Sequence, residues 1–169
     1  RTPGRSGRGP RRRLTAPEKP LVVRHQGLYL YKSAVNIGAM TTIETFLMFE
    51  GAAEEAITFY VGLFPDSKII DIARYGPEGP GPEGSVLRAS FRLAGRTYQC
   101  IDSHVKHGFG FTPSVSLFVS CDTEEELDRL YAALAEGGTP RMPLGDYGFS
   151  RKFGWTDDRF GVSWQLNLA

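Results

Sequence analysis

Hydrophobic and polar positions change period several times between Thr42 and Asp102, and each change predicts a new element. The β-rich run at 42–49 predicts a strand, which a Glu-Gly pair ends. Apolar residues then recur at the three- and four-residue spacing of an amphipathic helix that stops before Pro65. Alternating runs predict three further strands, the first two joined by a loop rich in proline and glycine. These strands are expected at 68–75, 85–93 and 96–102, and the loop at 76–84.

The second half of the chain repeats this order of elements without repeating the residues. A strand is predicted at 114–121 and a helix after Asp122, which can cap that helix with Glu125 as its capping-box partner. Three more strands are predicted at 139–144, 149–156 and 162–168, and the prolines of the first place it at a sheet edge. The order strand–helix–strand–strand–strand therefore occurs twice. We expect an α+β fold in which two βαβββ modules form a curved mixed sheet around a cleft.

Composition divides the chain at Met40. Residues 1–39 hold nine Lys or Arg and one acidic residue, whereas residues 40–169 hold eleven basic and eighteen acidic residues. We expect 1–39 to be a disordered basic leader of added or upstream sequence, the alternative being a targeting segment or basic arm. Residues 40–169 are expected to form the folded domain. Its acidic character argues against nucleic acid as a partner, because phosphate binding needs clustered Lys and Arg.

Two further features bear on where the protein works. No stretch approaches the roughly 20 apolar residues that a membrane helix needs, so no membrane partner is expected. Cys100 and Cys121 both lie inside apolar runs. They are expected to be buried free thiols and not a disulfide, which favours a reducing, cytoplasmic location.

Five motifs of the body occur in the same order as in one known family. They are TFLMFEGAAEEAITFYVGLFPDSKI, RYGPEGPGPEGSV, HGFGFTPSVSLFVSC, MPLGDYGFSRKFGW and DRFGVSWQLNL. Together with the repeat, they resemble the vicinal oxygen chelate superfamily, which includes glyoxalase I, extradiol dioxygenases and bleomycin-resistance proteins. Within it they resemble the PhnB-like branch, often named the 3-demethylubiquinone-9 3-methyltransferase domain. The resemblance covers 42–168 and implies paired modules around a ligand cleft and a homodimer.

The resemblance also indicates where a metal would be held. Catalytic members of the superfamily bind a divalent cation through His, Gln and Glu side chains on strands that face the pocket. The matching positions here are Thr45, Ser114 and Gln165, and two hydroxyls with one amide make a poor ligand set. We therefore expect an apo pocket and no cofactor. The alternative is a divalent metal held by Gln165, His107 and Asp102.

Other side chains are candidates for contact with a ligand. His107 and His104 follow Asp102 in a glycine-containing loop, where they either contact a ligand or order the loop. Arg151 precedes Lys152 at a strand end, where it either binds an anionic group or is solvated. No nucleophile with a paired base is visible, so no catalytic residue is assigned. The predicted substrate-binding set is Thr45, Gln99, Ser114, Trp155, Gln165, His107 and Arg151.

The sequence thus predicts a PhnB-like protein with a small-molecule-binding cleft and an unassigned reaction. Methyl transfer is doubted, because the one glycine-rich stretch, 76–84, contains prolines and precedes a strand. A cradle for S-adenosylmethionine needs a helix there. Two alternatives stay open: a metal-dependent lyase or dioxygenase acting on vicinal oxygens, and a non-catalytic protein that sequesters a drug-like molecule.

Overall fold

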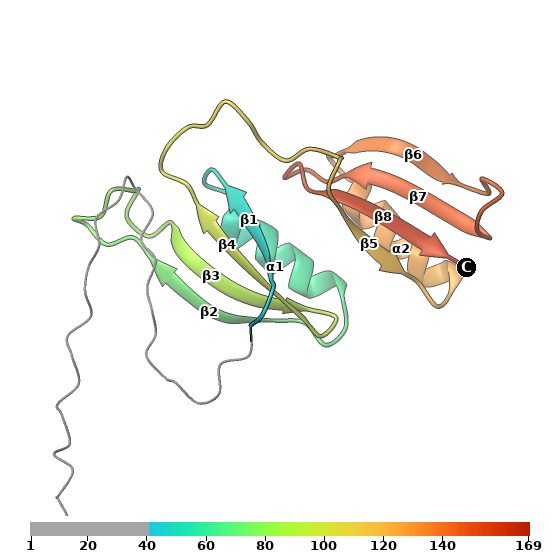
Figure 1. Ribbon diagram of the computed structural model, residues 1–169, viewed down its shortest axis with the longest axis horizontal. Coiled ribbons are helices and arrows are strands. Elements are labelled where there is room, and N and C mark those ends of the chain that lie inside the picture. Colours follow the sequence, from blue (N-terminus) through green and yellow to red (C-terminus); the bar gives the residue numbers. More distant parts are fainter. Residues whose placement is uncertain (1–40) are drawn as a thin grey trace, which may run out of the picture. The chain divides into compact units, whose positions relative to one another are not determined.

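The computed structural model describes residues 41–169, and the expected basic leader lies outside the described residues. Thr42–Ala169 form one compact unit. It contains two modules of one helix and four strands each (Figure 1). The first consists of β1 (Thr45–Phe49), α1 (Ala53–Leu63), β2 (Lys68–Arg74), β3 (Val86–Leu93) and β4 (Arg96–Asp102). The second consists of β5 (Ser116–Ser120), α2 (Glu124–Ala135), β6 (Thr139–Gly145), β7 (Lys152–Asp157) and β8 (Ser163–Leu168).

Each module forms its own four-stranded mixed sheet. Sheet A has the order β1-β4-β3-β2, and sheet B has the matching order β5-β8-β7-β6. The first strand of each module runs parallel to the last, and the other neighbours are antiparallel. The predicted α+β fold of two βαβββ modules is therefore confirmed, as two separate sheets. β6 lies at the edge of sheet B, as its prolines predicted.

The two helices cover one face of the sheets, and the core lies between the helices and that face (Figure 1). Strand side chains alternate, so Leu47 is buried toward α1 while its neighbour Phe46 is 53% exposed on the opposite face. The core is shared between the modules. Tyr60 and Phe64 of α1 contact the indole of Trp164 on β8 at ring-centroid distances of 5.2 and 5.5 Å. The fold of one module therefore depends on the other.

Two carboxylates satisfy buried backbone groups, one in each module. Asp102, at the end of β4, accepts hydrogen bonds from the amides of Gly51 and Ala53 at 2.8 and 2.9 Å, and from the amide of Val86 at 3.2 Å. The helix α1 has no capping side chain of its own, so Asp102 supplies the acceptor that its first turn lacks. The first helix is thus capped from a strand 49 residues away.

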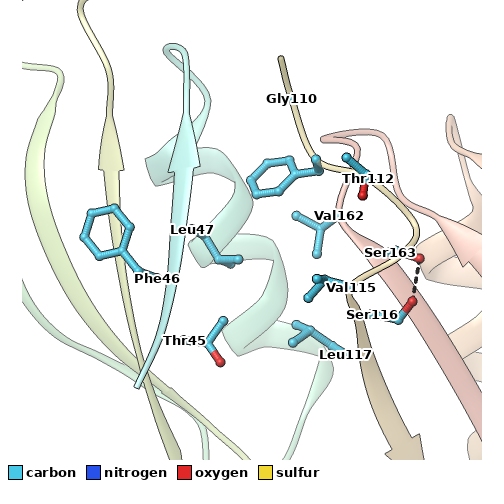
Figure 2. A pocket seen from close by; sticks show the side chains of 11 residues that line it. Thr45, Phe46, Leu47, Gly110, Thr112, Val115, Ser116, Leu117, Val162 and Ser163 are labelled. Atoms are coloured by element: carbon cyan, nitrogen blue, oxygen red, sulfur yellow. Dashed lines mark hydrogen bonds between the residues drawn. The ribbon is translucent and has the colours of Figure 1, made fainter. Parts of the chain in front are cut away.

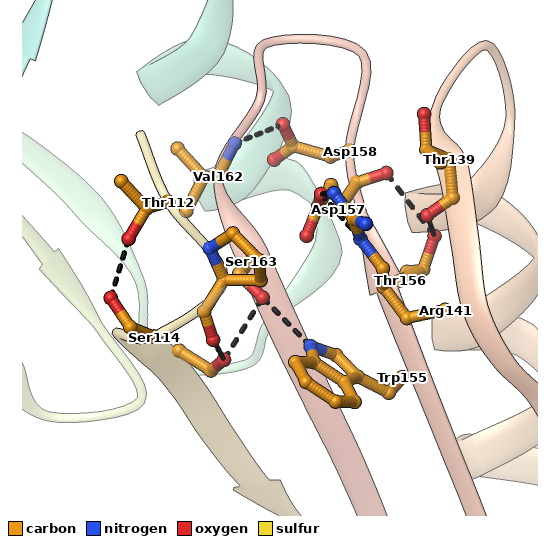
Figure 3. A network of polar contacts seen from close by, with 12 residues as sticks. Thr112, Ser114, Thr139, Arg141, Trp155, Thr156, Asp157, Asp158, Val162 and Ser163 are labelled. Carbon is orange, nitrogen blue, oxygen red and sulfur yellow. Dashed lines mark hydrogen bonds and ion pairs between the residues drawn. The ribbon is translucent and has the colours of Figure 1, made fainter. Parts of the chain in front are cut away.

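Asp158, in the turn between β7 and β8, joins the modules. Its Oδ2 accepts hydrogen bonds from the Tyr60 hydroxyl at 2.7 Å and the Trp164 indole at 2.8 Å. Its Oδ1 accepts from the amides of Phe160 and Val162, the second of which is drawn in Figure 3. Burial raises the pKa of the Asp158 carboxyl, and these four donors oppose the rise.

Two sequence predictions differ from the structure by one or two residues. Thr123, not Asp122, is the N-cap of α2: its side chain accepts a hydrogen bond from the Glu126 amide. The Glu126 carboxylate accepts a hydrogen bond at 3.1 Å from the amide of Asp122, the residue before the N-cap, so only the Thr123 half of a capping box is formed. β5 begins at Ser116, which leaves Ser114 in the preceding turn.

Cys100 and Cys121 are free and buried, as predicted. Burial raises the pKa of Cys100 to about 12 and that of Cys121 to about 11. Among residues 41–169, no helix is both long enough and apolar enough to span a bilayer.

Candidate functional site

Each sheet has an open face, which is the face turned away from the helices. Equivalent positions on the two open faces carry the same pair of residues. On sheet A, Phe46 of β1 stands opposite Gln99 of β4. On sheet B, Phe118 of β5 stands opposite Gln165 of β8, and Trp155 of β7 continues the row. Phe118 is 59% exposed, so this row presents an aromatic ring, an amide and an indole side by side.

A pocket lies between the unpaired edges of β1 and β5, and we call it the seam pocket (Figure 2). Its volume is about 290 Å³. In Figure 2 the side chains of Leu47 and Thr45 point across the gap toward Leu117, while the Phe46 ring points away. The lining contains no charged side chain; it consists of Thr45, Phe46, Leu47, Gly110, Phe111, Thr112, Val115, Ser116, Leu117, Val162 and Ser163.

A chain of hydrogen bonds connects the seam pocket to the open face of sheet B. The Trp155 indole donates to Ser163 Oγ at 2.8 Å, and Ser163 Oγ lies 2.9 Å from Ser116 Oγ (Figure 3). Ser116 Oγ also donates to the carbonyl oxygen of Pro113 at 3.4 Å. Because Ser116 is two residues before Phe118 and Ser163 is two before Gln165, both serines lie on the same sheet face as the Phe118–Gln165–Trp155 row.

The structure brings some of the predicted site residues together. Thr45 lines the seam pocket, and Gln165 and Trp155 lie next to it on sheet B. Gln99 lies on sheet A, where its amide nitrogen donates to Glu44 at 2.8 Å and to Ser90 at 3.2 Å.

Ser114 does not stand at the position equivalent to Thr45. Counted from the equivalent residues Phe46 and Phe118, Leu117 stands at that position, and it faces Trp164 on β8 as Thr45 faces Tyr98 on β4. Ser114 instead forms a hydrogen bond with Thr112.

The predicted histidine contacts lie in the loop between the modules, outside the seam pocket. His107 Nε2 lies 2.8 Å from Ser103 Oγ, and its amide donates to Glu50 at 2.9 Å. His104 Nδ1 lies 3.4 Å from the Tyr75 hydroxyl. Ser103 Oγ also lies 3.0 Å from the Val105 carbonyl oxygen, which can accept its proton. These contacts order the loop.

Arg151 is exposed in the turn before β7, and it does not line the seam pocket. Its neighbour Lys152 is held by two carboxylates of α2: Lys152 Nζ lies 2.7 Å from Glu124 and 2.6 Å from Asp128. Of this predicted anion-binding pair, one member is therefore committed to the protein itself.

The residues of the site do not fit a divalent metal. The seam pocket contains neither carboxylate nor imidazole, and among residues 41–169 no three His, Cys, Asp or Glu side chains lie close enough to share an ion. Asp102, one of the three proposed ligands, uses both oxygens on the backbone amides of Gly51, Ala53 and Val86. Hydroxyls and a single amide are weak donors for such a cation.

Several residues of the site were not predicted from the sequence. Ser116 and Ser163 could have been found, because each lies two residues from a predicted or aromatic position on the same strand face. Phe111 and Val115 carried no such signal. They reach the pocket only because the loop after β4 crosses between the modules, and the course of a loop cannot be read from periodicity.

Comparison with known proteins places the chain in a family. The profile of the family described as 3-demethylubiquinone-9 3-methyltransferase matches residues 41–167. The chain belongs to this family. A PhnB protein from Bacillus cereus, described under the same family name, is 56% identical; the match covers 76% of this chain and 100% of that chain, with a TM-score of 0.75. No curated protein matches the chain in sequence.

Two more solved structures extend the likeness. Protein PA1353 from Pseudomonas aeruginosa is 28% identical over 76% of this chain and 98% of that chain, with a TM-score of 0.66. A glyoxylase/bleomycin resistance protein/dioxygenase domain from Frankia is 15% identical over 78% of this chain and 93% of that chain, with a TM-score of 0.51. The latter shows the shared fold of paired βαβββ modules.

The family name describes methyl transfer, but the glycine-rich stretch 76–84 does not form a nucleotide cradle. It closes the hairpin between antiparallel β2 and β3. The Tyr75 amide donates to the Ser85 carbonyl at 3.0 Å, and the Gly84 amide donates to the Tyr75 carbonyl at 2.9 Å. A strand follows the stretch, whereas a cofactor cradle needs the N-terminus of a helix there.

Proposed function

We propose that this PhnB-like protein binds a small, neutral, largely apolar molecule in the seam pocket. The observation that carries the proposal is the lining itself: a pocket of about 290 Å³ between two sheets, with no charged side chain in its wall. Taking an ionised ligand out of water into such a wall is unfavourable unless a partner charge meets it. Apolar rings and alkyl groups gain free energy there.

The pocket lining favours ligand binding without catalysis. General acid–base catalysis needs a titratable group within hydrogen-bond reach of the reacting atom. The wall offers the hydroxyls of Thr45, Thr112, Ser116 and Ser163 and no carboxylate, imidazole, amine or thiol. A sequestering or carrier role is therefore proposed ahead of a lyase, dioxygenase or methyltransferase reaction.

The test compares ligands of one shape and different charge. 2-Naphthol and 2-methoxynaphthalene are neutral, and 2-naphthoate carries a carboxylate. Isothermal titration of the full chain should show saturable binding of both neutral compounds and none of 2-naphthoate. Failure of both neutral compounds to bind, or binding of all three alike, would contradict the proposal.

A pair of variants locates the binding. Val115 lines the seam pocket and is 73% exposed, so Val115→Trp can fill the pocket without disturbing the core. Val105 lies in the same loop, is 49% exposed and does not line the pocket, which makes Val105→Trp the matched control. Val115→Trp should weaken 2-naphthol binding by at least about tenfold, and Val105→Trp should leave it unchanged. Equal effects would place the ligand elsewhere.

We also propose that the chain forms a homodimer and works in the cytoplasm. Phe46 and Phe118 are more than half exposed at equivalent positions of the two open faces, and large exposed apolar side chains favour association. The buried free thiols support a reducing compartment. Analytical ultracentrifugation should give twice the chain mass for the full-length protein and a shift toward the monomer for Phe118→Ser. A monomeric wild type would contradict the assembly.

A further inference from the structure

We infer that the Trp155–Ser163–Ser116 hydrogen-bond chain gives the seam pocket a fixed polarity, so that it selects neutral, apolar molecules carrying a hydroxyl or N–H donor. The inference rests on the proposed function and names the class of ligand that the same pocket takes. It concerns the end of the pocket formed by Ser116 and Ser163 (Figure 2).

The direction of the chain follows from its two ends. At one end is the Trp155 indole nitrogen, which can only donate; its hydrogen bond to Ser163 Oγ is 2.8 Å long. At the other end is the Pro113 carbonyl, which can only accept, and Ser116 Oγ lies 3.4 Å from it. Either serine can donate across the contact between them, and we assign the Ser116 proton to Pro113 because that carbonyl can only accept. The Ser163 proton then goes to Ser116 across the 2.9 Å between the two hydroxyl oxygens.

This arrangement leaves lone pairs and no unused proton at that end of the pocket. Each serine oxygen can accept two hydrogen bonds and donate one. Ser116 has donated to Pro113 and accepted from Ser163, and Ser163 has donated to Ser116 and accepted from Trp155. Each oxygen thus retains one lone pair. A ligand hydroxyl or N–H finds an acceptor there, whereas a ligand ether or ketone oxygen faces another oxygen.

Trp155 acts in this site as a positioning residue. It does not line the seam pocket, but its N–H holds one lone pair of Ser163 and anchors the direction of the chain. Thr45 lies on the opposite wall of the pocket. Its hydroxyl forms no hydrogen bond with another residue of 41–169, so it can donate to a ligand or accept from one. The preference for ligands with a hydroxyl or N–H donor therefore comes from Ser116 and Ser163. Thr45 reduces this preference because its hydroxyl can also donate to a ligand oxygen.

The experiment measures the ratio of affinities for 2-naphthol and 2-methoxynaphthalene by titration of the full chain. The ether buries one more methyl group, so a purely apolar pocket would bind it more tightly. The wild-type protein is instead expected to prefer 2-naphthol by about three- to tenfold. Thr45→Val should widen this preference, because it removes the hydroxyl that can donate to the ether.

Two variants test the chain. Ser116→Ala removes the half-buried acceptor and should bring the ratio to one or below, whereas the control Ser120→Ala, exposed on the same strand, should leave it unchanged. Trp155→Phe removes the donor that holds one lone pair of Ser163, so the Ser163 hydroxyl can rotate and donate into the pocket, and the preference for 2-naphthol should narrow. A general loss of packing at Trp155 would weaken both ligands together and would overturn its positioning role.

The outcomes separate this inference from the proposed function. If both compounds bind and Val115→Trp blocks both, but the wild type does not prefer 2-naphthol, the pocket stands and its fixed polarity is wrong. If neither compound binds, the proposed function fails and this inference fails with it.

Discussion

The two modules carry the same pair of residues on their open faces and use it differently. Gln99 of the first module is held by Glu44 and Ser90. Gln165 of the second forms no side-chain hydrogen bond within residues 41–169, and it stands between Phe118 and the indole of Trp155. Duplicated topology therefore does not give duplicated side-chain contacts. In the first module the glutamine amide is bonded to neighbouring side chains. In the second module the glutamine amide, which lies beside the seam pocket, can bond to a ligand.

The buried carboxylates show the same division. Asp102 binds backbone amides of its own module only, whereas Asp158 binds the Tyr60 hydroxyl of the other module as well as its own turn. Asp102 thus stabilises its own module alone. Asp158 connects the two modules. It thereby helps to fix the distance between β1 and β5, where the seam pocket lies.

The largest effect is expected at Asp158. Each Asp158 oxygen accepts two hydrogen bonds: Oδ2 from the Tyr60 and Trp164 side chains, and Oδ1 from two backbone amides. Asp158→Asn replaces one of these oxygens with an NH₂ group, which faces two donors and can accept from neither. Unfolding in urea should show a loss of about 2–5 kcal/mol in the free energy of unfolding.

The matched control is Asp146→Asn. Asp146 is exposed and accepts one hydrogen bond, from the Gly148 amide at 2.8 Å within its own turn, so less than about 0.5 kcal/mol should be lost. Similar losses in the two variants would show that Asp158 does not join the modules as described.

The two glutamines give a smaller contrast. Gln99→Ala removes hydrogen bonds to Glu44 and Ser90 and should lower the free energy of unfolding by about 1 kcal/mol. Gln165→Ala removes an amide without a protein partner in the described part of the chain and should change it by less than about 0.5 kcal/mol. Urea unfolding of both variants measures the difference. A larger loss for Gln165→Ala would reverse the comparison between the modules.

The smallest effect separates the two thiols. Burial raises the pKa of Cys100 to about 12 and of Cys121 to about 11, so at pH 8 both are almost entirely protonated. Labelling of the folded protein by a thiol-specific reagent, followed by peptide mass spectrometry, should be slow, with Cys121 modified before Cys100. In urea both should react at the same rapid rate. Fast labelling of the folded chain would contradict the burial of these thiols.

The repeat could be predicted from the sequence because it rests on local signals. Period-two and period-3.6 patterns located every strand and helix, and the prolines of 139–144 placed β6 at its edge. Errors occurred at boundaries, where two residues compete for one role. Asp122 and Thr123 can both cap a helix, and only the three-dimensional position of Glu126 decides between them.

The site was less predictable, because it depends on contacts between segments far apart in the chain. Alternation within β7 and β8 was sufficient to put Trp155 and Gln165 on one face. No local pattern could show that β1 and β5 leave a gap, that Phe111 enters it, or that Asp102 is committed to the backbone. The Ser163–Ser116 contact joins residues 47 positions apart, so no local pattern could show it.

The most direct test of the central claim is a crystal structure of the full chain with 2-naphthol. We expect the ring between β1 and β5, against Leu47 and Leu117, with its hydroxyl within hydrogen-bond distance of Ser116 Oγ. A ring bound only on the open face of sheet A, or density between β1 and β5 that shows no naphthol at saturating concentration, would contradict it.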